Sequence, residues 1–340
     1  MPSASWWWRR LLGMAATLLG VLFVTFAMLE LAPVDRAQLA VARAQQNVAF
    51  ADLDARERAL VRLRVRYGLL DEHTLEPEPL PRRFGRWLWH AVTLRWHGPA
   101  DEPRQFWERL ARAVPVTGMV GGLALALGTC VGVWLGVRLG CRTGGLADRL
   151  ASPVLFTLAG VPEFVLAALL TLLLASGGLG WLPGGGLHRQ GSEALVWWAR
   201  WLDGLWHLVL PVGVLATGPF VLVTRFVRDA VARAAQQPFA AALRGFGAEP
   251  ALLRRRLLRH GLLALLPLTG GLLPMLVGGS IVVESLFHLD GMGQLAYRAA
   301  RELDQPMVMA VVLVTSVVTL LALLAADLLQ QWLDPRVQRP

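Results

Sequence analysis

Long apolar runs dominate the chain and predict helices that cross a membrane. A run of about 20 apolar residues, wound as an α-helix, spans the hydrocarbon core of a bilayer. Six runs are candidates, and they cover residues 11–31, 113–137, 151–176, 205–224, 261–283 and 307–326. The second run has no charged residue, whereas the third contains Pro162 and Glu163. The pattern therefore predicts an all-α membrane protein with six transmembrane helices.

The composition agrees with this class. Of the 340 residues, 55% are hydrophobic and only 17% are charged, against about 25% charged in soluble domains. The net charge of +9 would suggest nucleic acid in a soluble protein, but arginine also gathers in the cytoplasmic loops of membrane proteins. We therefore expect the protein to lie in a lipid bilayer and not to bind nucleic acid.

Arginine in the short loops predicts the orientation. With the N-terminus in the cytoplasm, residues 138–150 and 225–260 also face the cytoplasm and carry eleven arginines. The opposite loops, residues 177–204 and 284–306, carry four. The positive-inside rule thus places both termini in the cytoplasm. The first run follows Arg9 and Arg10, as the apolar region of a signal peptide follows basic residues. However, the run is long and no clear small-x-small cleavage site follows it, so we favour an uncleaved first helix.

A polar insertion separates the first two runs. Residues 32–112 carry fourteen arginines and eleven acidic residues, and long segments translocate largely regardless of charge. Helical spacing followed by the proline-rich EPEPLPRR predicts a small helical region. We divide the chain into residues 1–32, the insertion 33–112 and the core 113–340. The tryptophans of the insertion suit either a membrane interface or a small core; they are Trp87, Trp89, Trp96 and Trp107.

The chain contains no lysine, because all 33 basic residues are arginine. The phosphate-binding loop GxxxxGK[ST] and Schiff-base chemistry both need lysine. HExxH is also absent, and the histidines of the insertion lack metal-ligand spacing. We therefore predict a protein that is not an enzyme and holds no cofactor or metal. If ATP drives it, another subunit hydrolyses the ATP.

A basic loop, residues 229–260, lies between the fourth and fifth runs. From residue 238 the sequence reads PFAAALRGFGAEPALLRRRLLRHGLLALLP. Its alanine-rich start favours a short helix, which Gly245 and Gly247 would end in a left-handed cap. Glu249 and Pro250 suit the start of a second helix. The spacing fits either a rigid helical hairpin or a solvated loop that only sets the topology.

This loop resembles the EAA loop of ABC-transporter permeases, in the dipeptide and oligopeptide branch. Residues 284–318 resemble that family's Glu-x-x-Phe … Pro-Gly-x-Gly … Arg-Asp-x-Pro block, with Asp290 in place of proline. The tail ADLLQQWLDPRV resembles its Asp-Leu … Asp-Pro-Arg ending. The matching residues are Phe239, Ala242, Arg244, Gly247, Glu284, Phe287, Gly291, Gly293, Asp304, Pro306, Asp327, Asp334, Pro335 and Arg336.

The resemblance implies the type I ABC importer permease fold, with a periplasmic helical insertion between helices 1 and 2, in the bacterial inner membrane. It implies a homologous second permease subunit, two P-loop ATPase subunits that hold Mg-ATP, and a periplasmic substrate-binding protein. It also implies that the loop 229–260 docks on an ATPase. The docking residues would be Phe239, Ala242, Arg244, Gly247 and Glu249.

Di- and oligopeptides are the substrates that the resemblance favours, although relatives of this branch carry nickel chelates, glutathione or peptide antibiotics. Glu163 and Glu284 are the candidate residues of the translocation path. A carboxylate at Glu163 is costly inside a membrane unless it faces a cavity or a partner, so it could meet a substrate's ammonium group or pair with an arginine. Glu284 lies at the outer end of the fifth run and suits a brace for the following loop better than a substrate site.

Two other classes compete with the importer. A stand-alone secondary transporter or channel would show an internal repeat or paired intramembrane charges, and neither is clear in the sequence. A membrane enzyme would need a nucleophile with its base, or a metal set, inside the apolar runs. No such set is evident.

Overall fold

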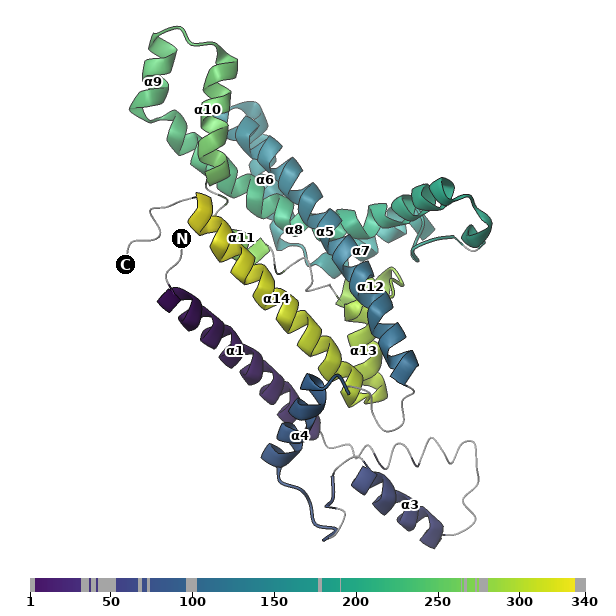
Figure 1. Ribbon diagram of the computed structural model, residues 1–340. Coiled ribbons are helices and arrows are strands. Elements are labelled where there is room, and N and C mark those ends of the chain that lie inside the picture. The colour runs from purple at the N-terminus through teal and green to yellow at the C-terminus, as the bar shows by residue number, and fades with distance from the viewer. Residues whose placement is uncertain are drawn as a thin grey trace. The chain divides into compact units, whose positions relative to one another are not determined.

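The computed structural model describes most of the chain as helices. It describes residues 4–31, 37, 41, 53–66, 69–71, 74–95, 103–176, 179–189, 191–263, 265, 268–272, 274 and 281–333. The helices, drawn in Figure 1, are α1 (Ala4–Glu30), α3 (Leu53–Arg66), α4 (Leu80–Val92), α5 (Pro103–Cys141), α6 (Leu146–Gly160), α7 (Glu163–Thr171), α8 (Trp197–Ala235), α9 (Pro238–Gly245), α10 (Pro250–Leu263), α11 (Thr269–Leu272), α12 (Ile281–Leu286), α13 (Met292–Glu302) and α14 (Gln305–Leu333). Over these residues the all-α prediction is confirmed.

Four described helices are long and apolar enough to cross a membrane. They are Ser5–Glu30, Arg104–Cys141, Trp197–Ala235 and Gln305–Trp332. They contain the second, fourth and sixth predicted runs, and the first run up to Glu30. The third run forms a broken pair, Leu146–Gly160 and Glu163–Ala175, that bends by 102°. Much of the fifth run, including residues 275–280, lies outside the described residues. A count of six spans therefore stays a prediction.

The chain divides into two compact units. One comprises Met1–Ser3, Arg112–Gln294 and Val318–Pro340, and the other Ala4–Ala111 and Leu295–Val317. The second unit has an apolar cluster in which Leu22 and Phe26 of α1 pack with Met309 of α14 and Trp87 of α4. Trp87 thus lies in a small core, whereas Trp89 is exposed. Trp96 lies outside the described residues.

In the first unit, α5 packs on α8 through a glycine at every fourth position. These glycines are Gly128, Gly132, Gly136 and Gly140. A Cβ atom at Gly128 would lie 2.6 Å from the carbonyl oxygen of Ala216, and one at Gly140 would lie 2.6 Å from that of Arg228. The absent side chains therefore let the two backbones approach closely, as in many membrane helix pairs.

Candidate functional site

The basic loop folds as a helical hairpin beyond the end of α8. Figure 1 shows α9 and α10 side by side. Between them Gly247 has a φ of +70°. The Gly247 N–H donates to the Arg244 carbonyl (3.1 Å), and the Ala248 N–H donates to the Leu243 carbonyl (2.9 Å). This pair of bonds is a Schellman motif, which favours glycine at the left-handed position. The predicted helix end with a left-handed residue at Gly247 and the predicted start of a second helix at Pro250 are confirmed.

Apolar packing attaches this hairpin to α8. Leu257 of α10 is buried together with Val227 and Val231 of α8. At the base of the hairpin, the rings of Phe239 and His260 stack with their centroids 5.1 Å apart and their planes 25° apart. The segment is therefore a packed hairpin rather than a solvated loop. A displacement of α9 would be transmitted to α8 through these contacts.

The tip of the hairpin is open to solvent. Phe246, which lies between two glycines at the turn, is 89% exposed. Of the expected docking residues, Phe239 packs inward, and the others are exposed: Ala242, Arg244, Gly247 and Glu249. Phe246 was not among the residues predicted from the resemblance. The sequence signal that could have identified Phe246 is an apolar side chain flanked by two glycines, Gly245 and Gly247.

Glu284, at 2% exposure, is fixed by hydrogen bonds within the first unit. Its carboxylate accepts the Thr117 hydroxyl (2.7 Å) and the Gln294 N–H (3.0 Å). The Thr117 oxygen in turn accepts the Met292 N–H (2.7 Å). A Cβ atom at Gly291 would lie 2.5 Å from the carboxylate. The geometry favours the brace that the sequence suggested, and it adds Thr117 as the partner on α5.

Glu163 has a different setting, since it is the first residue of α7, directly after the break in the bent pair. Its side chain is half-buried. Among the described residues, no hydrogen bond or ion pair holds its carboxylate, in contrast to Glu284. The position at the 102° bend leaves this carboxylate available to a partner or a solute.

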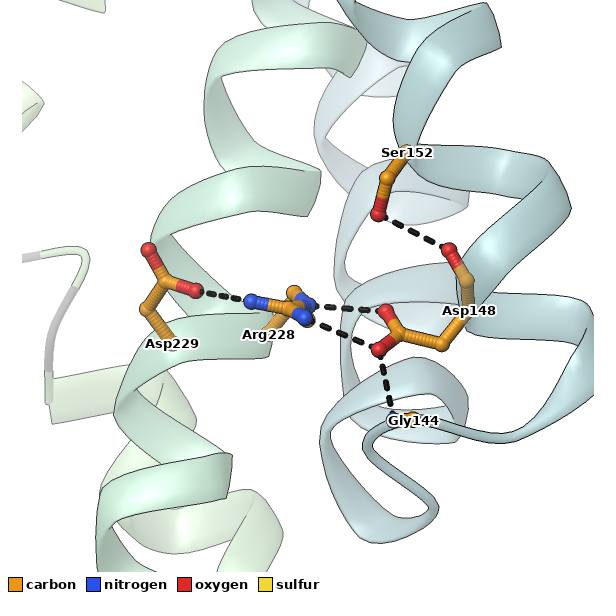
Figure 2. Close-up of polar contacts among 5 residues, drawn as sticks. All are labelled: Gly144, Asp148, Ser152, Arg228 and Asp229. Atoms are coloured by element: carbon orange, nitrogen blue, oxygen red, sulfur yellow. Dashed lines mark hydrogen bonds and ion pairs between the residues drawn. The ribbon is translucent and has the colours of Figure 1, made fainter.

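A third polar cluster, which sequence reasoning missed, joins α6 to α8 (Figure 2). The Arg228 guanidinium donates from Nε and Nη2 to the two carboxylate oxygens of Asp148, both at 2.8 Å. The Gly144 N–H also donates to Asp148 (2.9 Å), and Arg228 Nη1 donates to the neighbouring Asp229 (2.7 Å). In the sequence, Arg228 was only one of the arginines of residues 225–260 that predict the orientation.

Comparison with known proteins decides the class of the protein. The family of binding-protein-dependent transport system inner membrane components matches residues 128–339. The chain belongs to this family. The resemblance to ABC-transporter permeases is thereby confirmed, and the chain is a transport permease component rather than an enzyme.

Relatives from several bacteria support this assignment. The oligopeptide transport system permease protein AppB of Bacillus subtilis is 32% identical over 179 residues, which are 52% of this chain and 55% of AppB. The match therefore spans about half of AppB. The peptidoglycan transport system permease protein YejB of Agrobacterium fabrum is 24% identical over 263 residues, 76% of this chain and 72% of YejB. A putative peptide permease protein of Brucella ovis is 28% identical over 338 residues, 97% of each chain.

Proposed function

We propose that this chain is one of two permease subunits of an ATP-driven importer of di- and oligopeptides. The observation that carries the proposal is the exposed hairpin around Gly247, which packs on the end of a membrane helix in a chain of this family. Two P-loop ATPase subunits hydrolyse Mg-ATP, since this chain has no lysine for such a site. A periplasmic binding protein delivers the substrate.

The hairpin couples ATP hydrolysis to transport. With both termini in the cytoplasm, α9 and the turn enter a groove on one ATPase subunit. Closure of the ATPases moves the hairpin and α8 together, because Leu257 and the stacked pair Phe239–His260 join them. The translocation pathway between the two permease subunits then shifts between inward- and outward-facing states.

Peptides are the proposed substrates for two reasons. The names of AppB and the Brucella ovis relative assign peptide transport to those proteins. In addition, a peptide carries an ammonium group, which a half-buried carboxylate without a described partner would attract. Glu163 is the residue to which we assign this contact.

Affinity purification tests the assembly. The tagged chain is extracted in mild detergent, and its partners are identified by mass spectrometry. We expect a second permease of the same family and P-loop ATPases. Recovery of the chain alone or as a homo-oligomer would contradict the proposal and favour a stand-alone secondary transporter. Uptake of labelled tripeptide, glutathione and nickel chelate by cells with and without the chain then tests the substrate class.

A further inference from the structure

In the turn before α6 and in its first turn, one side chain alone is buried against the rest of the unit. Residues 142–147, 149 and 150 are exposed, including Leu146 at 74%. Asp148 is the exception at 4% exposure, and it points to Arg228 of α8 (Figure 2). The apolar packing of α6 begins at Ala151, which packs against the cluster that Leu155 forms with Val221 of α8 and Leu139 of α5. The Asp148–Arg228 pair is thus the tie at this end of α6.

The pair is suited to hold a defined geometry. A bidentate arginine–carboxylate contact fixes both distance and orientation. The Gly144 N–H donates to the same carboxylate and holds it in place. Asp148 is buried, but Arg228 keeps 30% of its side chain exposed, and neither exposed nor buried ion pairs contribute strongly to stability. Stability alone is therefore a weak reason for the pair. Orientation of α6 relative to α8 is the property that the pair adds.

The pair lies between two functional elements of the same unit. Arg228 is about two helical turns before the end of α8 at Ala235, where the chain turns into the hairpin. Asp148 lies in the first turn of α6, a helix of 15 residues that runs to the break before Glu163. A movement of the hairpin that rotates the end of α8 therefore reaches the first turn of α6 through this ion pair, and along α6 it reaches the bend.

We propose that Asp148 and Arg228 are positioning residues that make α6 follow the hairpin during the transport cycle. This inference rests on the proposed function, since the hairpin moves only if an ATPase drives it. Without the pair, the hairpin and α8 move but the first turn of α6 does not follow. ATP hydrolysis then continues while less substrate crosses the membrane for each ATP.

Distance measurement between spin labels tests the proposal directly. Labels are placed at the exposed positions Leu146 on α6 and Ala241 on α9, after Cys130 and Cys141 have been replaced by alanine. The purified complex with bound ATPases is compared without nucleotide and after trapping with ATP and vanadate. In the wild type we expect the distance to change by less than about 1 Å, as within a rigid body. In Asp148→Asn we expect a change of more than about 2 Å.

Asp229→Asn is the matched control. It removes a carboxylate that also accepts from Arg228 but lies on α8 itself, so the tie to α6 is kept. We expect the wild-type distances in this variant, and radiolabelled trialanine transported per ATP within about twofold of wild type. For Asp148→Asn we expect that ratio to fall roughly fivefold or more, the lower end of ordinary allosteric coupling.

Either of two results overturns the inference: a wild-type distance that changes between the two states, or an Asp148→Asn complex that behaves as wild type. If Asp148→Asn does not assemble, Arg228→Lys is measured in the same way, because lysine keeps the charge but not the bidentate contact. Wild-type behaviour of the assembled Arg228→Lys complex also overturns it. Absence of ATPases from the wild-type preparation contradicts the proposed function instead, so the two failures are distinguishable.

Discussion

The left-handed turn of the hairpin can be tested with a pair of alanine substitutions. Gly247 has a φ of +70°, whereas Gly245 is the last residue of α9 and has no positive φ. An added Cβ atom would meet no other atom within 4 Å at either position. The two substitutions therefore differ in backbone conformation and not in packing.

The expected free energies differ in sign. An alanine forced into the left-handed region costs roughly 1–2 kcal/mol, so Gly247→Ala strains the turn. Replacing a glycine in the middle of a helix by alanine stabilises the helix by roughly 0.5–1 kcal/mol, so Gly245→Ala, at the last residue of α9, favours the helix by at most about that amount. If the strained hairpin relaxes when it is free and must regain its shape to dock, a cost of about 1–2 kcal/mol weakens ATPase binding about 5- to 30-fold.

The assay is a titration of the purified ATPase subunits onto the detergent-solubilised permease pair, followed by fluorescence. We expect Gly247→Ala to raise the dissociation constant about 5- to 30-fold, and Gly245→Ala to leave it within about twofold of wild type. Gly247→Asn should fall between them, because asparagine tolerates the left-handed conformation better than alanine. Equal affinity of Gly247→Ala and wild type, or equal losses at both glycines, would refute the reasoning.

Three further substitutions address the candidate path residue Glu163 and two close contacts at glycines. Glu163→Gln should reduce peptide uptake while the ATPases still co-purify, and unchanged uptake would count against a substrate contact. Gly291→Ala would place a Cβ atom 2.5 Å from the Glu284 carboxylate, so we expect a loss of roughly 1–3 kcal/mol in thermal unfolding; an unaltered Tm would contradict the brace. Gly140→Leu should separate α5 from α8 and lower the Tm. Gly122→Leu is the control that should leave the Tm unchanged, because a Cβ atom at Gly122 would meet no other atom within 4 Å. Equal Tm values for these two variants would show that the close approach does not matter.

Local backbone chemistry made the hairpin predictable. Gly247 and Pro250 restrict the backbone in ways that depend on a few neighbouring residues, and the structure has the stop and restart where the sequence places them. The apolar runs were predictable for a similar reason, since burial in lipid demands apolar residues over a fixed length. The choice between a packed hairpin and a solvated loop was not local, because it depends on contacts of Leu257 with α8.

Contacts between residues far apart in the chain could not be predicted from the sequence. Asp148 and Arg228 are 80 residues apart, and Thr117 and Glu284 are 167 apart. Each of these side chains has an ordinary explanation when it is considered alone. Arg228 fits a topology signal, and Thr117 fits an apolar helix. The third run contains Pro162, but proline alone does not fix a bend of 102°.

Photo-crosslinking from the tip of the hairpin tests the central claim most directly. Phe246 is replaced by the photoreactive amino acid benzoylphenylalanine in the tagged chain, and membranes are irradiated before purification. Trp197, which is 77% exposed at the opposite end of α8, receives the same replacement as a control. The account predicts a covalent adduct with a P-loop ATPase from position 246 and no such adduct from position 197. Two results would contradict the account. One is an ATPase adduct from position 197, and the other is the absence of any protein adduct from position 246.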